Sequence, residues 1–182
     1  MNRKTLSFTR LSLALLISII ASACALTSPL KGNVYSSTAL AAEINLTDHN
    51  GQPFKLSSFR GKVVLVFFGF SSCQTECPGT MAIIRQALQT DGLTAQDVEV
   101  VMVSTDPGND TPQAMKEFMG RFNPSFLGLL GTPDQLAKSW QDYSVAVQDG
   151  GETHSSFTYV VDKQGNLKSC SPGNKGKSPA MR

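Results

Sequence analysis

The chain has 182 residues, of which 41% are hydrophobic and 16% charged. This composition favours one folded domain with a sizeable core plus an N-terminal extension, and it argues against a mainly disordered chain. The formal net charge of +2 includes three basic residues in the first ten positions, Arg3, Lys4 and Arg10. Without them, 13 basic residues face 14 acidic residues, a net charge of −1. A near-neutral body without a basic cluster argues against nucleic acid as a partner.

Residues 1–24 have the pattern of an export signal. The basic start precedes the apolar run 11–20 and then the small residues Ala-Ser-Ala. The apolar run is shorter than the roughly 20 residues that span a bilayer comfortably. The small residues before Cys24 resemble a bacterial lipobox, in which that cysteine becomes lipidated. Lipid anchoring through Cys24, a cleaved signal and an uncleaved membrane anchor stay open, and a later cleavage site at 39–41 is an alternative. All of them predict a body on the periplasmic side of a bacterial membrane, and we favour the lipid anchor.

The next segments are a tether and a short hairpin. Residues 25–42 are rich in Ser, Ala and Thr without periodicity, which is typical of a flexible tether. Residues 44–47 and 53–55 lie on either side of an Asn-Gly turn and predict two antiparallel strands. His49 stands beside this turn, and we expect it to be a solvated surface histidine.

Three apolar runs predict buried strands. Residues 63–68, 98–103 and 157–161 are rich in β-branched and aromatic side chains, which is typical of strands covered on both faces. The third run turns through Asp-Lys-Gln-Gly into Leu167 and predicts a closing hairpin.

Helices are expected between these strands. Pro78 suits the first position of a helix that continues as an amphipathic segment to Leu88. Residues 110–112 and 132–135 each place a capping residue before a proline, and the second also has the spacing of a capping box. These two helices should run to about 122 and 143. We expect Asp106 in a loop turn and Asp110 at a helix start rather than in a carboxylate metal site, and core positions for Phe118, Phe122 and Trp140.

Strands alternating with helices, followed by a hairpin, predict an α/β sandwich of the thioredoxin type with an N-terminal hairpin over residues 43–168. Residues 169–182 have no apolar face and predict an irregular tail in place of a closing helix. The tail is then disordered, or the chain is a shortened relative of a longer one. A sheet without its covering helix exposes apolar surface and should be less stable.

Cys73 and Cys77 lie four residues apart where the first buried strand gives way to a helix. Such a pair can hold a metal, exchange a disulfide or attack a peroxide. A structural disulfide here would close a very short loop and contribute little stability. If Cys77 caps the helix that Pro78 opens, the helix dipole stabilises its thiolate, the form that binds metal or attacks a disulfide.

His154 supplies a third donor. It stands in the loop before the last buried strand, and in a thioredoxin-like sheet that loop passes beside the strand-to-helix loop. Two thiolates and one imidazole form a soft, low-coordinate set that suits copper, Cu(I) above all, and suits structural zinc poorly because a fourth ligand is missing.

The segments 67–78, 103–107, 110–112 and 154–162 together resemble the Sco/SenC copper chaperones, thioredoxin-like proteins that help cytochrome c oxidase to mature. The resemblance implies that Cys73, Cys77 and His154 ligate one copper ion per chain, as Cu(I) or Cu(II). It implies as partner the copper-bearing subunit of that oxidase or another periplasmic copper protein. The family usually has Asp immediately before the ligand histidine, where this chain has Thr153.

Two rivals remain. A thiol–disulfide oxidoreductase would use a redox-active Cys73–Cys77 disulfide on the acceptor's cysteines and would not need His154. A peroxidase of this fold would also carry a reactive cysteine after an apolar strand. The sequence favours a metallochaperone over an enzyme, and it leaves open whether copper delivery or reduction of the acceptor is the task.

Overall fold

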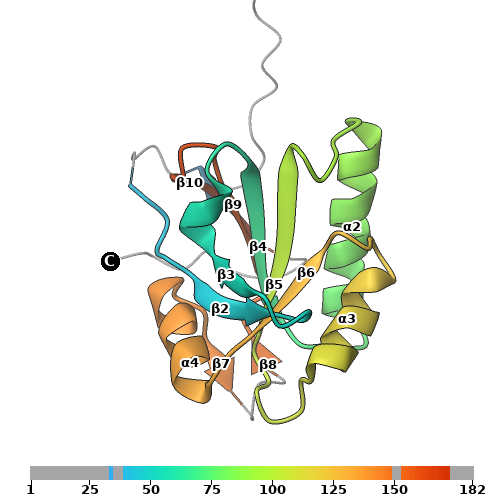
Figure 1. Ribbon diagram of the computed structural model, residues 1–182, viewed down its shortest axis with the longest axis vertical. Helices are drawn as coiled ribbons and strands as arrows, with labels where there is room; N and C mark the ends of the chain where they lie inside the picture. Colours follow the sequence, from blue (N-terminus) through green and yellow to red (C-terminus); the bar gives the residue numbers. More distant parts are fainter. Residues whose placement is uncertain (1–32, 35–38, 149–152, 173–182) are drawn as a thin grey trace, which may run out of the picture. The chain divides into compact units, whose positions relative to one another are not determined.

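The computed structural model describes residues 33–34, 39–148 and 153–172 (Figure 1). All of them belong to one compact unit, Lys31–Arg182. The predicted export signal and its Cys24 therefore lie outside the described residues. No helix within the described ranges is both long and apolar enough to cross a membrane.

The described residues form an eight-stranded sheet in the order β1-β10-β9-β4-β5-β6-β2-β3. At its centre, β4 pairs parallel with β5, and β5 pairs parallel with β6. On the other side of β4, β9 runs antiparallel. Three of these strands were predicted, whereas β6 was not, because it is short and contains Gly128. The bounds are β4 Val63–Gly69, β5 Val98–Ser104, β6 Leu127–Leu130 and β9 Phe157–Val161.

The sheet's outer strands come from both ends of the domain. The predicted N-terminal hairpin is present as β2 (Asn45–Asp48) and β3 (Pro53–Lys55), and β2 also pairs with β6. The short β1 (Asn33–Val34) pairs with β10 (Leu167–Pro172), so part of the expected tether joins the sheet.

The irregular tail predicted from residue 169 begins later, because β10 continues to Pro172. Its main chain pairs with β9 across a register shift between Leu167 and Ser169. Main-chain hydrogen bonds require no apolar pattern, so the strand conformation of residues 169–172 could not be predicted from side-chain type. The predicted absence of a closing helix concerns residues after Pro172, which lie outside the described ranges.

Helices cover both faces of the sheet (Figure 1). Helices α2 (Glu76–Thr90) and α3 (Pro112–Gly120) pack on one face, and α4 (Pro133–Asp142) lies on the other with the 3-10 turn η1 (Leu56–Phe59). The predicted caps of α3 and α4 are confirmed. Thr111 accepts from the Ala114 amide, and Thr132 forms a full capping box with Gln135. The layers are those of the expected α/β sandwich.

The alternation of side chains along β4 creates two cores. Val64, Val66 and Phe68 face α4, whereas Phe67 faces α2 and α3 beside Cys77. The second core is rich in sulfur, because Met81, Met102, Met115 and Met119 are all fully buried in it. Cys77 is therefore part of an apolar core as well as part of the candidate site.

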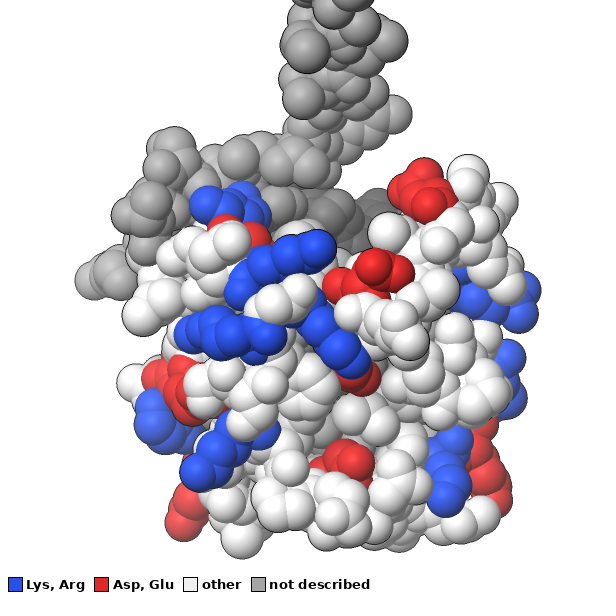
Figure 2. Space-filling model, turned by 45° about the horizontal axis from the view of Figure 1, so that its top comes forward, with Lys and Arg blue, Asp and Glu red and all other residues white. Residues whose placement is uncertain are grey.

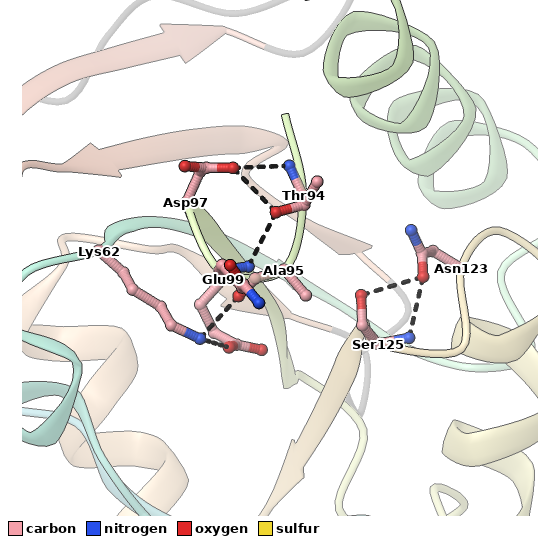
Figure 3. Close-up of polar contacts among 8 residues, drawn as sticks. Lys62, Thr94, Ala95, Asp97, Glu99, Asn123 and Ser125 are labelled. Carbon is pink, nitrogen blue, oxygen red and sulfur yellow. Dashed lines mark hydrogen bonds and ion pairs between the residues drawn. The ribbon is translucent and has the colours of Figure 1, made fainter. Parts of the chain in front are cut away.

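The end of the sheet remote from the cysteines is fixed by polar contacts (Figure 3). The Asp97 carboxylate accepts from the amide and hydroxyl of Thr94, and these bonds lower its pKa. Lys62 donates to the Ala95 carbonyl at 2.7 Å and pairs with Glu99 at 3.6 Å. These contacts fix the start of β5 against the start of β4. On the face shown in Figure 2, basic and acidic side chains lie among one another instead of forming a surface of one sign.

Candidate metal centre

The segment between β4 and α2, residues 70–75, carries Cys73 and is called the metal loop below. Helix α2 begins at Glu76 with Thr75 as its N-cap, so Cys77 lies within the first turn and Pro78 is the third helical residue. The prediction that Cys77 caps the helix was wrong. The Cys77 amide donates to Cys73 Sγ at 3.3 Å, and this sulfur satisfies a first-turn N–H in place of a capping side chain.

The Cys77 thiol is fully buried, with 0% of its surface exposed. Burial raises the pKa of this thiol, and the hydrogen bond with Cys73 adds to the effect. The expected thiolate, stabilised by the helix N-terminus, is therefore not the favoured form in the copper-free chain, since loss of hydration outweighs the helix dipole. A metal cation at the sulfur would favour the thiolate and reverse this balance.

His154 reaches Cys77 from a small hairpin. It lies in β8 (Thr153–His154), which pairs with β7 (Val147–Gln148). Its Nε2 is 3.8 Å from Cys77 Sγ. Its ring meets the rings of Phe67 and Phe70 edge-on, with centroids 6.1 and 5.7 Å apart. The apolar surroundings hold the imidazole in one orientation.

The protonation of His154 suits a ligand. Its Nδ1 lies 3.3 Å from the Ser155 carbonyl oxygen, which can only accept, so Nδ1 carries the proton and Nε2 keeps its lone pair. Burial lowers the pKa of the ring and keeps it neutral. In the copper-free chain, the Cys77 S–H can therefore donate to Nε2.

The three predicted ligands are brought together in part. Cys77 and His154 are adjacent, whereas Cys73 Sγ is directed at the Cys77 amide. Both cysteines are free, and Cys73 is partly exposed. Within the described ranges, no group of three or more His, Cys, Asp or Glu side chains is already arranged as a closed metal site.

A hydrogen bond joins the segment that carries His154 to the helix that carries Cys77. The Ser156 hydroxyl donates to Oε2 of Glu76, the first residue of α2. Ser156 lies two residues after His154, and Glu76 immediately precedes Cys77. This bond therefore fixes the histidine's segment against the helix that carries the buried thiol.

Asp110 lies at the start of α3 as expected, directly before the N-cap, and it has a second role at the site that the sequence did not predict. Thr111 caps α3, and the buried Asp110 carboxylate instead fixes the metal loop. Its Oδ1 accepts from the amide and hydroxyl of Ser71 at 2.8 and 2.6 Å, and its Oδ2 accepts from Ser104 Oγ at 2.5 Å. Asp106 lies in the expected loop turn and accepts from Asn109.

Gly69, the last residue of β4, was also missed. A Cβ at this position would stand 2.8 Å from Phe67 Cε1 and 2.9 Å from Cys77 Sγ. Real Cβ atoms do not approach other atoms so closely, so the missing side chain provides the space for the buried sulfur. The glycine directly before the metal loop was the signal available in the sequence.

The expectation for His49 was wrong. The residue is buried, with 8% of its surface exposed, and its Nδ1 accepts from the Gly128 amide at 3.0 Å. Burial lowers the pKa of its ring. It contacts β6 through this bond and lines a groove beside Ser71 and Ser72.

The fold agrees with comparisons with known proteins. The SCO1/SenC family profile matches residues 34–182. The chain belongs to the SCO1/SenC family. The matched residues extend from before the metal loop to beyond the strand that follows His154.

Two relatives show how far the similarity extends. Mitochondrial SCO2 of Saccharomyces cerevisiae is 34% identical over 143 residues, which cover 73% of this chain and 48% of the yeast protein. An SCO2-like protein of Rickettsia conorii is 32% identical over 149 residues, covering 75% of this chain and 73% of that protein. The chain thus spans about half the length of its yeast relative.

A solved structure shows the same architecture. ScoI of Bradyrhizobium japonicum, solved with copper bound, has a TM-score of 0.66 and 33% sequence identity. The match covers 72% of this chain and 88% of that protein. The thioredoxin-like α/β fold of the SCO1/SenC family is therefore confirmed for this chain.

Proposed function

We propose that this chain is a copper metallochaperone that carries one copper ion on Cys73, Cys77 and His154. The observation that carries the proposal is the 3.8 Å approach of His154 Nε2 to Cys77 Sγ. The ion is cargo that the chain receives and passes on. The acceptor we propose is the copper-bearing subunit of cytochrome c oxidase, or another periplasmic copper protein.

The donor spacing fits a metal ion. Metal–sulfur and metal–nitrogen bonds of about 2.3 and 2.0 Å that meet at about 120° place sulfur and nitrogen about 3.7 Å apart. The separation of Cys77 Sγ and His154 Nε2 matches this value without any backbone movement. Soft sulfur with imidazole favours copper, and the copper-bound state of the ScoI relative supports the same choice here.

Cys73 would complete the set by turning its side chain. Its sulfur already lies 3.3 Å from the Cys77 amide, and it is the more exposed of the two thiols. A three-coordinate ion leaves a position open to an incoming ligand. We therefore expect Cys73 to be the first ligand that an acceptor's donor group replaces during transfer.

The proposed location rests on the N-terminal pattern. The basic start, the apolar run 11–20 and the small residues before Cys24 support export and lipid attachment on the periplasmic side of a bacterial membrane. Mass spectrometry of the mature chain should find a lipid on Cys24. A chain that keeps residues 1–24 or starts after a later cleavage site would contradict this anchor.

The copper role is tested with the full chain, reduced and then titrated with Cu(I) against a competing chelator. We expect binding to saturate at one ion per chain. Absence of tight binding, or saturation at another ratio, would overturn the carrier assignment. Reduction is essential, because only free thiols can ligate the metal.

A thiol–disulfide oxidoreductase would not need the imidazole of His154, whereas the copper carrier would. His154→Ala should abolish tight copper binding, whereas a thiol oxidoreductase would keep full activity on an acceptor's disulfide in this variant. Cys73→Ser and Cys77→Ser variants that trap a mixed disulfide with the acceptor would favour the rival. The rival is considered because both cysteines are free and Cys73 Sγ lies next to residue 77, 3.3 Å from its amide nitrogen.

A further inference from the structure

A groove with a volume of about 1110 Å³ adjoins the metal loop. Its walls come from the β2–β3 turn, the metal loop and α3 with the segment after it. We call it the α3 groove; its lining includes His49, Ser71, Ser72, Lys116, Glu117 and Arg121. It exceeds the usual size of a small-molecule pocket, roughly 300–1,000 Å³, and suits a segment of polypeptide.

His49 is built into this groove. Its amide donates to the Gly128 carbonyl at 2.9 Å, and its Nδ1 accepts from the Gly128 amide at 3.0 Å. A side chain at position 128 would clash with Met115, since its Cβ would stand 2.9 Å from Met115 Cβ. Gly128 therefore lets α3 and the histidine pack on β6 together.

The ring of His49 presents a donor to the groove. Because Nδ1 accepts a hydrogen bond, the neutral ring carries its proton on Nε2. Within the part of the chain that the structure describes, no buried side-chain nitrogen or oxygen lacks a partner. Nε2 forms no hydrogen bond with the described residues, so it cannot be one of the buried atoms and must be accessible. Because the ring lines the groove, this N–H is available to a ligand there.

The lining of the α3 groove contains two cations and one acidic residue. Lys116 and Arg121 both line the groove, and the Arg121 guanidinium is held over the Phe118 ring at 5.0 Å. Burial lowers the pKa of His49; the charge of Asp48 opposes this shift, and the charge of Lys116, the smaller of the two charge effects, adds to it. Glu117, the acidic residue of the lining, accepts from Gln113 Nε2 at 2.6 Å.

The other acidic residue near His49 is also engaged. Asp48 Oδ1 accepts from the amides of Asn50 and Gln52 within the β2–β3 turn, so it does not occupy the donors of the groove. The α3 groove thus offers two cations and one neutral N–H donor against the single carboxylate of Glu117, which is already hydrogen-bonded to Gln113. Carboxylates are the complementary groups.

The groove is continuous with the metal loop. Ser72, part of its wall, directly precedes the partly exposed Cys73. Ser71, also part of the wall, is fixed by the buried Asp110. A segment lying in the groove would therefore end beside the thiol that is open to solvent.

We propose that the α3 groove binds an acidic segment of the copper acceptor, through Lys116, Arg121 and the Nε2–H of His49. Docking there would bring the acceptor's ligands to Cys73 for exchange. This inference rests on the proposed copper-carrier function, and it names the recognition surface and the partner's chemistry.

The test measures binding apart from copper transfer. The probe is the copper-free soluble domain of the cytochrome c oxidase subunit encoded in the same genome, titrated against the copper-free full chain. The test variant is Lys116→Glu/Arg121→Glu; both side chains are exposed, so the fold should persist. The control is Lys55→Glu/Lys163→Glu, which changes the net charge equally at exposed residues outside the groove.

We expect the groove variant to raise the dissociation constant roughly tenfold or more at 0.05 M salt, through slower association. The control should stay within about threefold, and the difference should shrink at 0.5 M salt as charges are screened. Equal weakening in both variants would overturn the proposal, as would no binding by the unmodified chain. A dimer of the chain that the groove substitutions dissociate would also overturn it.

Copper titration of the same variants separates this proposal from the carrier function. Both double variants should still bind one copper ion as tightly as the unmodified chain. If the chain binds no copper, the carrier function is contradicted. If the groove substitutions still weaken binding of the oxidase domain in that case, the groove assignment stands.

Discussion

His154 Nε2 lies 3.8 Å from Cys77 Sγ, although 77 residues separate the two in the chain. The contact joins the first turn of α2 to the β7–β8 hairpin inside an apolar shell that includes Phe67 and Phe70. Both groups are neutral in this setting, because burial raises the pKa of the thiol and lowers that of the imidazole. The pair is therefore ready to exchange one proton for a metal ion.

Copper affinity should rise with pH. The proton of the Cys77 thiol must leave when the metal binds, and burial raises its pKa, so the thiol is protonated before binding. His154 contributes no competing proton above about pH 6.5, because its pKa is lowered. The logarithm of the Cu(I) association constant should increase by about one or more per pH unit between about pH 6.5 and 8. A pH-independent constant in chelator competition would contradict this protonation scheme.

Asp110→Asn should loosen the metal loop. The substitution weakens charge-assisted bonds to Ser71 and Ser104, and we expect it to lower the free energy of unfolding by about 1.5–3 kcal/mol and to weaken copper binding. Urea unfolding and chelator competition measure the two effects. The matched control is Asp142→Asn, which breaks an exposed pair with Lys138 at 2.6 Å and should cost less than about 0.5 kcal/mol. Equal costs in both variants would contradict the special role of Asp110.

Gly69→Ala should displace the buried sulfur. The added methyl group would meet Phe67 and Cys77 within 3 Å, and such overpacking costs about 1–3 kcal/mol. We expect weaker Cu(I) binding together with lower stability. Gly79→Ala is the control; Gly79 lies in α2, the helix that carries Cys77, and nothing lies within 4 Å of a Cβ built there. Alanine there should maintain or raise stability, by up to about 1 kcal/mol, and leave copper binding unchanged.

Ser156→Ala should speed copper release. It removes the bond to Glu76 that fixes the histidine's segment against α2. Since a hydrogen bond contributes about 1 kcal/mol, the dissociation rate should rise about fivefold in stopped-flow transfer to a chelator. Ser125→Ala is the control: its hydroxyl donates to Asn123 at 3.0 Å in a connection away from the site (Figure 3). The idea fails if both variants release copper at the same rate.

The fold was predictable to the extent that it depends on local patterns. The apolar run of β4 and the Thr-Pro starts of α3 and α4 each contain their own signal. By contrast, β6 has only four residues, and β7 and β8 have two each, so periodicity is too short to detect. These strands exist because neighbouring chain segments supply their hydrogen bonds.

The proposed ligands could be named from the sequence, whereas the residues that support them in the fold could not. Cys73, Cys77 and His154 stood out by residue type, spacing and family resemblance. The roles of Asp110 and His49 depend on partners 39 and 79 residues away, Ser71 and Gly128. A residue beside a helix start or a turn looks local in the sequence, and only the folded chain brings such distant partners to it.

The most direct test of the account is the Cu(I) affinity of His154→Ala, measured in the full chain by chelator competition. Loss of a partner behind a ligand typically costs 10–100-fold, so loss of the ligand itself should weaken binding at least about a hundredfold. Gln148→Ala, an exposed change on the paired strand β7, should bind copper as the unmodified chain does. Undiminished affinity in a folded His154→Ala variant would contradict a copper site built on Cys73, Cys77 and His154.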